Sequence, residues 1–107
     1  MSEIGEEDRK LMTLARGAMA RAGADHGAAV RDLDGRSYAG APVALAALSL
    51  TALQVAVATA VSSGAQGFEA AVLIGEVDGA DPGVAALREV THEAHVLLVD
   101  AAGEARR

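Results

Sequence analysis

The histidines are the side chains of this sequence with the clearest chemical potential. His92 and His95 stand three residues apart in the segment 91–95, next to an expected strand. Two imidazoles bind one metal from a helix when they are four residues apart, as in His-Glu-x-x-His. The spacing therefore favours a solvated loop, with a metal site as the alternative. His26 follows Asp25, which favours a turn pair over a general base.

The other residue types give weaker indications of catalysis or ligand binding than the histidines do. The chain has no cysteine, which excludes a thiolate metal site, a cysteine nucleophile and a disulfide scaffold. Ser62 and Ser63 have no histidine and aspartate at a recognisable nucleophile spacing, so we interpret them as the polar end of a helix. The segment 79–83 is interpreted as a loop, with an anion site on its backbone amides as the alternative. Residue types and spacing alone predict no catalytic residue and no metal ligand.

The length and the net charge of the chain limit the number of domains and the kinds of ligand that we expect. The sequence has 107 residues, which predicts a single domain over 1–107, with residues 1–5 flexible. Fifteen acidic residues against nine basic ones give a formal charge of −6, which argues against direct binding of nucleic acid. The acidic N-terminus has no apolar segment, so we expect a cytoplasmic protein. The arginine-rich, alanine-rich composition suggests a bacterial source.

One uncharged stretch, residues 41–61, is about as long as a membrane span. Because it is rich in alanine and carries polar residues, we expect a buried central helix over about 44–63, with a membrane helix as the alternative. Thr51 and Gln54 are polar residues on this expected helix. We interpret them as bonded to each other or to the backbone inside the core, and the alternative is that they line a pocket.

The remaining segments alternate between helical and extended patterns. Apolar residues at three- and four-residue spacing predict a helix over 6–22, and Pro82 is well placed to open a short helix to about Val90. Asp34-Gly35 between two short extended runs predicts a hairpin of strands. Continuous apolar runs predict buried strands over 68–76 and 96–99. The order of elements predicts an α/β fold with one sheet between helical layers.

Three segments occur in the order and near the spacing of a known family. These are Gly27-Ala28-Ala29-Val30-Arg31, Asp34-Gly35-Arg36-Ser37-Tyr38-Ala39-Gly40 and Ala60-Val61-Ser62-Ser63-Gly64. Together they resemble the small cytidine deaminases. The resemblance implies a three-layer α/β/α sandwich whose mixed sheet has an N-terminal antiparallel hairpin followed by parallel-type strand-helix units. It also implies a zinc-bound water that attacks the base, with a glutamate moving protons.

The residues that carry this chemistry in the family differ here. Its Cys-Ala-Glu or His-Ala-Glu motif falls on Thr51-Ala52-Leu53, and its Pro-Cys-x-x-Cys motif falls on Pro82 to Ala86. The degenerate motif positions are therefore Thr51, Leu53, Gly83 and Ala86. The family's ribose-contacting segment becomes Pro42-Val43-Ala44. A remnant of the nucleoside pocket would be lined by Thr51, Gln54, Pro42 and Ala44.

These differences lead to a functional prediction. We predict a cytidine deaminase-like protein without zinc or other cofactor that is not an enzyme and serves as a structural or protein-interaction module. The resemblance implies a homodimer or homotetramer, the identity of any other protein partner being open. The alternative is a module that binds a nucleoside or nucleotide without turnover. An active cytidine deaminase or another hydrolase is less favoured.

Overall fold

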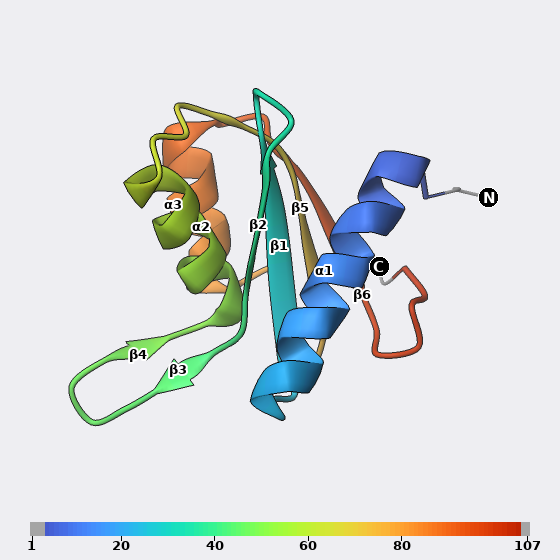
Figure 1. The fold of residues 1–107 in the computed structure, drawn as a ribbon, viewed down its shortest axis with the longest axis vertical. Helices are drawn as coiled ribbons and strands as arrows, with labels where there is room; N and C mark the ends of the chain where they lie inside the picture. Colours follow the sequence, from blue (N-terminus) through green and yellow to red (C-terminus); the bar gives the residue numbers. More distant parts are fainter. Residues whose placement is uncertain (1–3, 106–107) are drawn as a thin grey trace.

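The structure, a computed structural model, describes residues 4–105 and orders them into three helices and six strands (Figure 1). The helices are α1 (Glu6–Ala22), α2 (Ala52–Ser62) and α3 (Pro82–Val90). The strands are β1 (His26–Asp32), β2 (Ser37–Gly40), β3 (Val43–Ala44), β4 (Ser49–Leu50), β5 (Phe68–Gly75) and β6 (His95–Val99). The predicted flexibility of residues 1–5 falls partly on residues 1–3, which lie outside the described part of the chain.

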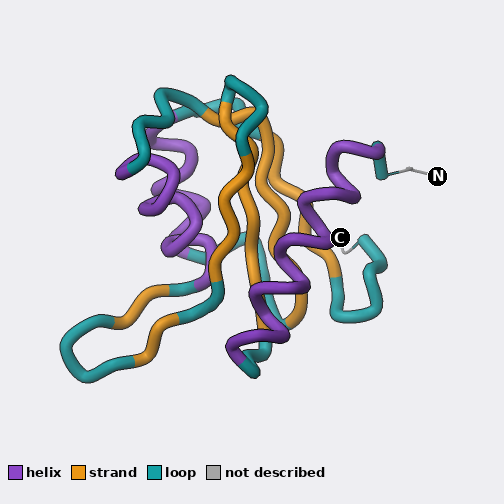
Figure 2. The backbone as a smooth tube through the Cα atoms, in the orientation of Figure 1, coloured by secondary structure: helices purple, strands orange, loops and turns teal. Residues whose placement is uncertain are grey.

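The main sheet has the strand order β2-β1-β5-β6. β1 pairs antiparallel with both β2 and β5, and β5 pairs parallel with β6 across the α3 connection. This mixed sheet confirms the predicted fold class. β3 and β4 form a separate two-stranded hairpin that projects from the body of the molecule (Figures 1 and 2).

The sheet lies between two helical layers, with α1 on one face and α2 and α3 on the other (Figure 2). Strand β5 contributes to both cores, because successive side chains of a strand point to opposite faces. Ala71 and Leu73 belong to the core under α2 and α3, whereas Val72 and Ile74 belong to the core under α1. The continuous apolar run of this segment therefore follows from burial on both faces.

The first hairpin is closed by a buried carboxylate. Asp32 is 2% exposed and accepts hydrogen bonds from the Asp34 and Arg36 backbone N–H groups and from the Tyr38 hydroxyl. Burial alone would raise the pKa of Asp32, but these hydrogen bonds to its ionised form lower the pKa below its ordinary value. Burial of Tyr38 and its hydrogen bond to Asp32 raise the pKa of the Tyr38 hydroxyl. Gly35 completes the turn with φ of 85°.

The prediction of a continuous helix over 44–63 is wrong for its first eight residues. α2 begins at Ala52, and residues 43–50 form the β3–β4 hairpin instead. The physical reason is a capping box at Thr51. Its hydroxyl accepts from the Gln54 N–H while the Gln54 side chain accepts from the Thr51 N–H, which fixes the helix start. Among the described residues, no helix is long and apolar enough to cross a membrane.

Candidate functional site

The degenerate motif positions and Gln54 lie in or next to the first turns of α2 and α3, at the end of the sheet where β1 also starts (Figure 1). Thr51 is the N-cap of α2 and Asp81 is the N-cap of α3. The two caps are joined directly, because the Thr51 hydroxyl donates to Asp81 Oδ1 over 2.8 Å. The same oxygen accepts from the Gly83 N–H over 2.7 Å. One carboxylate oxygen therefore holds the beginnings of both helices.

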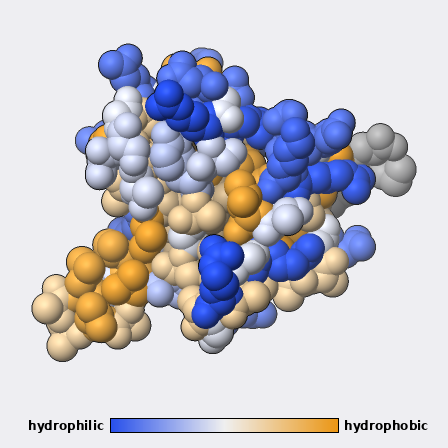
Figure 3. Space-filling view, in the orientation of Figure 1, coloured by the Kyte–Doolittle hydropathy of each residue, from blue (hydrophilic) through white to orange (hydrophobic). Residues whose placement is uncertain are grey.

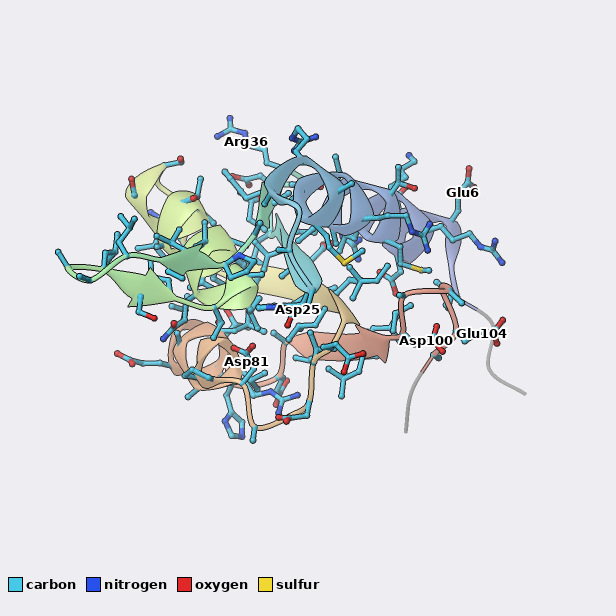
Figure 4. All side chains as sticks on the ribbon, turned by 90° about the horizontal axis from the view of Figure 1, so that it is seen from below. Glu6, Asp25, Arg36, Asp81, Asp100 and Glu104 are labelled. Atoms are coloured by element: carbon cyan, nitrogen blue, oxygen red, sulfur yellow. The ribbon has the colours of Figure 1, made fainter. Side chains whose placement is uncertain are left out.

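A second pair of side chains, Asp25 and His26, lies at the start of β1 and contacts the start of α2. The Ala52 N–H donates to His26 Nε2 over 3.2 Å, and His26 Nδ1 lies 2.8 Å from Asp25 Oδ1. Because Nε2 accepts, the ring proton lies on Nδ1 and is donated to Asp25. Figure 4 views this end of the fold from below and shows Asp25 and Asp81 there. The predicted turn pair of Asp25 and His26 is confirmed, and His26 also satisfies a free N–H of the helix.

Thr51 and Gln54 are bonded to each other, as one of the two interpretations expected. The hydroxyl of Thr51 is used twice, since it accepts from the Gln54 N–H and donates to Asp81. These are the contacts of a helix cap. Pro42 and Ala44 lie elsewhere, on the β3–β4 hairpin and its approach, where Ala44 is exposed and pairs with Ser49. Membership of a ligand pocket stays a prediction for all four residues.

Two of the degenerate motif positions, Leu53 and Gly83, meet as an apolar contact. Leu53 is fully buried, and a Cβ atom added to Gly83 would lie 2.6 Å from Leu53 Cβ and 2.9 Å from the Gln54 backbone nitrogen. Real side chains do not approach that closely. Ala86 follows on α3 and packs half-buried against the same core. The absence of a side chain at Gly83 therefore lets the two helices close on each other.

The donor set at these positions does not fit zinc. Zinc in proteins is held by thiolate, imidazole or carboxylate groups. Gly83 and Ala86 offer none of these, and the Thr51 hydroxyl already donates to Asp81. No group of three or more histidine, aspartate or glutamate side chains within residues 4–105 lies where it could hold a metal ion. The other two histidines of the sequence are separate from this end, His92 in an exposed turn and His95 at the exposed start of β6.

Sequence reasoning missed the role of Asp81. Asp81-Pro82-Gly83 carries a recognisable signal, because aspartate is a preferred N-cap and proline is favoured at the first helical position. That signal predicts a cap for α3 but not the bond to Thr51, which lies 30 residues away in the sequence. The contact of His26 with Ala52 spans 26 residues and likewise has no local signal.

Comparisons with known proteins support the fold. A family model described as cytidine deaminase-like matches residues 4–103. The cytidine deaminase of Burkholderia pseudomallei is similar in structure, with a TM-score of 0.80 and 21% identity over 96% of this chain and 91% of that one. The cytidine deaminase of Mycobacterium tuberculosis gives a TM-score of 0.73 and 22% identity over 96% and 91% of the two chains. That of Mycobacterium leprae gives 0.70 and 20% over 94% and 92%. Comparison with curated protein sequences finds no match.

These similarities correct one prediction. The chain was expected not to be an enzyme because the family's catalytic motifs are degenerate. The solved structures compared above are cytidine deaminases, which are enzymes, and this finding contradicts that expectation. Degenerate motif positions do not by themselves decide whether a protein has activity. The match over residues 4–103 decides the family: the chain belongs to the cytidine deaminase-like proteins.

Proposed function

We propose that this protein is a self-associating structural module of the cytidine deaminase-like family, a homodimer or homotetramer whose contacts form through the β3–β4 hairpin. The observation that carries the proposal is the exposure of this hairpin, residues 41–50, which we call the arm. The arm projects from the body and forms the apolar extension at the lower left of Figure 3.

The arm exposes large apolar side chains. Leu45 is 63% exposed and Leu48 is 49% exposed, and the residues between them are alanines that are also exposed. Its two strands are joined by two residue pairs, Val43 with Leu50 and Ala44 with Ser49. An isolated two-stranded hairpin is marginally stable in water, so an arm of this kind gains order when a partner surface covers it.

Charge favours a second copy of this chain as the partner. The sequence has no charged residue from Ser37 to Phe68, although it carries a formal charge of −6. This stretch comprises β2, the arm and α2, and the outward side of α2 adds Ala58 and Val61 as exposed residues. Two copies repel each other through their acidic surfaces, whereas their uncharged surfaces meet without that cost. A patch that pairs with its own copy also closes the assembly by symmetry.

Light scattering after size-exclusion chromatography tests this proposal. A monomer has a mass of 10.7 kDa, and we expect the wild type at a multiple of that mass. The double variant Leu45→Glu/Leu48→Glu should run as a folded monomer, because it places two charges on the arm. The matched control is Leu33→Glu, which changes a leucine of 60% exposure in the β1–β2 turn and should keep the wild-type mass. A monomeric wild type, or an arm variant that keeps the assembly, refutes the proposal.

We place the protein in the cytoplasm, and the cysteine-free sequence is compatible with a reducing compartment.

Binding of a nucleoside or nucleotide is the alternative function, with Thr51 and Gln54 as the residues that would face the ligand. The Thr51 hydroxyl and Gln54 Oε1 are used in hydrogen bonds at the helix start, so no specific contact favours that function over self-association.

A further inference from the structure

The junction between the first turns of α2 and α3 carries an inference of its own, independent of self-association. Two helix N-termini lie together here, and each brings the positive end of its dipole and N–H groups that need partners from outside the helix. By the resemblance to the cytidine deaminases, the zinc ligands of that family fall on Thr51, Gly83 and Ala86, within these two helix starts. In this chain the donor set does not fit zinc, so something else must hold the junction.

The two helices leave no room for a side chain at position 83. The α2 residue that lies against Gly83 is Leu53, and a Cβ atom at position 83 would meet Leu53 Cβ at 2.6 Å and Cγ at 2.7 Å. A metal held by the motif positions would need a ligand side chain at position 83. Gly83 has no side chain, and a side chain added there would collide with the fully buried Leu53.

The Asp81 carboxylate joins the two helix starts. Asp81 Oδ1 accepts from the Gly83 N–H of its own helix at 2.7 Å and from the Thr51 hydroxyl of the other helix at 2.8 Å. The carboxylate thus lies where two positive helix ends meet, which is where a negative charge is most favourable. Thr51 is fixed in turn by its capping box with Gln54.

We propose that Asp81 and Thr51 form a metal-independent clamp that closes the α2–α3 junction at the motif positions, where Leu53 packs against Gly83. The clamp couples the two helix starts, so loss of one partner removes most of what the other contributes. The clamp and self-association through the arm are measured separately, and either can fail without the other.

A double-mutant cycle tests the clamp. Thr51→Val and Asp81→Ala should each lower the melting temperature by several degrees, and the double variant should lose clearly less than the sum. The matched control pairs Thr51→Val with Asp78→Ala. Asp78 also accepts the N–H two residues ahead, that of Ala80, but is not bonded to Thr51, so this pair should be additive. Thr51→Ser keeps the hydroxyl and should stay near the wild type.

Two results overturn the proposal. One is additivity of Thr51→Val and Asp81→Ala, which would show that their bond contributes nothing. The other comes from melting the wild type with a chelator and with added zinc chloride. We expect the two melting temperatures to agree, and a higher one with zinc, together with one retained zinc per chain by mass spectrometry, would show a metal at the junction.

Discussion

Gly83→Ala is the substitution whose outcome depends most directly on the closeness of α2 and α3. In an ordinary helix position, alanine is more stable than glycine by about 0.5 to 1 kcal/mol. Gly83 is the second residue of α3, after Pro82, and is fully packed. Its added Cβ would lie 2.6, 2.7 and 2.9 Å from three heavy atoms of Leu53 and Gln54, well inside normal contact distance. Two of those three atoms, Leu53 Cβ and the Gln54 nitrogen, cannot rotate away.

Gly83→Ala should therefore lower the stability of the protein, whereas the same substitution raises stability in an ordinary helix position. Over-packing of this kind costs about 1 to 3 kcal/mol, which exceeds the gain in helix propensity. We expect Gly83→Ala to be less stable by about 1 to 2 kcal/mol, which corresponds to a melting temperature lower by roughly 4 to 16 °C in a domain of this size. Thermal unfolding followed by circular dichroism, together with urea unfolding, measures both quantities.

A second glycine provides the control. Gly17 lies within α1, and a Cβ there would meet only the flexible end of Arg21, at 3.3 Å. Gly17→Ala should therefore raise stability by about 0.5 to 1 kcal/mol. The same substitution thus changes sign between two helices of one protein. If Gly83→Ala melts at or above the wild type, the two helices are not as close as we describe, and the closed junction is refuted.

Three further predictions follow from the remaining buried contacts. The pKa of Asp32 is lowered in the folded state, so its contribution to stability is complete above its unfolded pKa of about 3.9 and is lost as the pH falls through the lower folded value. Asp32→Asn should flatten the fall of stability in that acidic window in urea titrations, and an unchanged slope would contradict this. His26→Ala removes the acceptor of the Ala52 N–H and should cost about 1 to 3 kcal/mol, whereas His26→Gln should restore part of it in the same melting assay. Gly75→Ala should lose more stability than Gly35→Ala, because both have positive φ but only Gly75 is crowded by a neighbouring backbone; equal losses would exclude crowding.

Elements with strong local patterns were predictable. The helix over 6–22 was predicted with its bounds, because apolar residues recur at helical spacing and Gly23 ends it in the left-handed conformation with φ of 61°. The helix over 82–90 was predicted from Pro82 at its first position. The strands β5 and β6 were predicted within one residue at each end from their continuous apolar runs.

The arm was not predictable by the same reasoning. Residues 44–51 are uncharged and rich in alanine and leucine, so no period separates strand from helix there. The signal that was available is the Thr51-Ala52-Leu53-Gln54 capping box, which marks a helix start at Thr51. The bonds of Asp81 to Thr51 and of His26 to Ala52 join residues far apart in the sequence, so they depend on the tertiary fold and not on local preference.

The position of β5 has a consequence for how this chain acquires its structure. Ala71 and Leu73 complete the core on one face and Val72 and Ile74 complete the core on the other, so neither layer can be buried without β5. Its pairing with β1 joins residues that lie between 36 positions apart, as Asp32 and Phe68 do, and 49 positions apart, as His26 and Gly75 do. A nascent chain that ends before Phe68 has no β5 and therefore cannot complete either core. We expect unfolding in a single transition, with no surviving subdomain, and slow folding limited by closure of the β1–β5 pair.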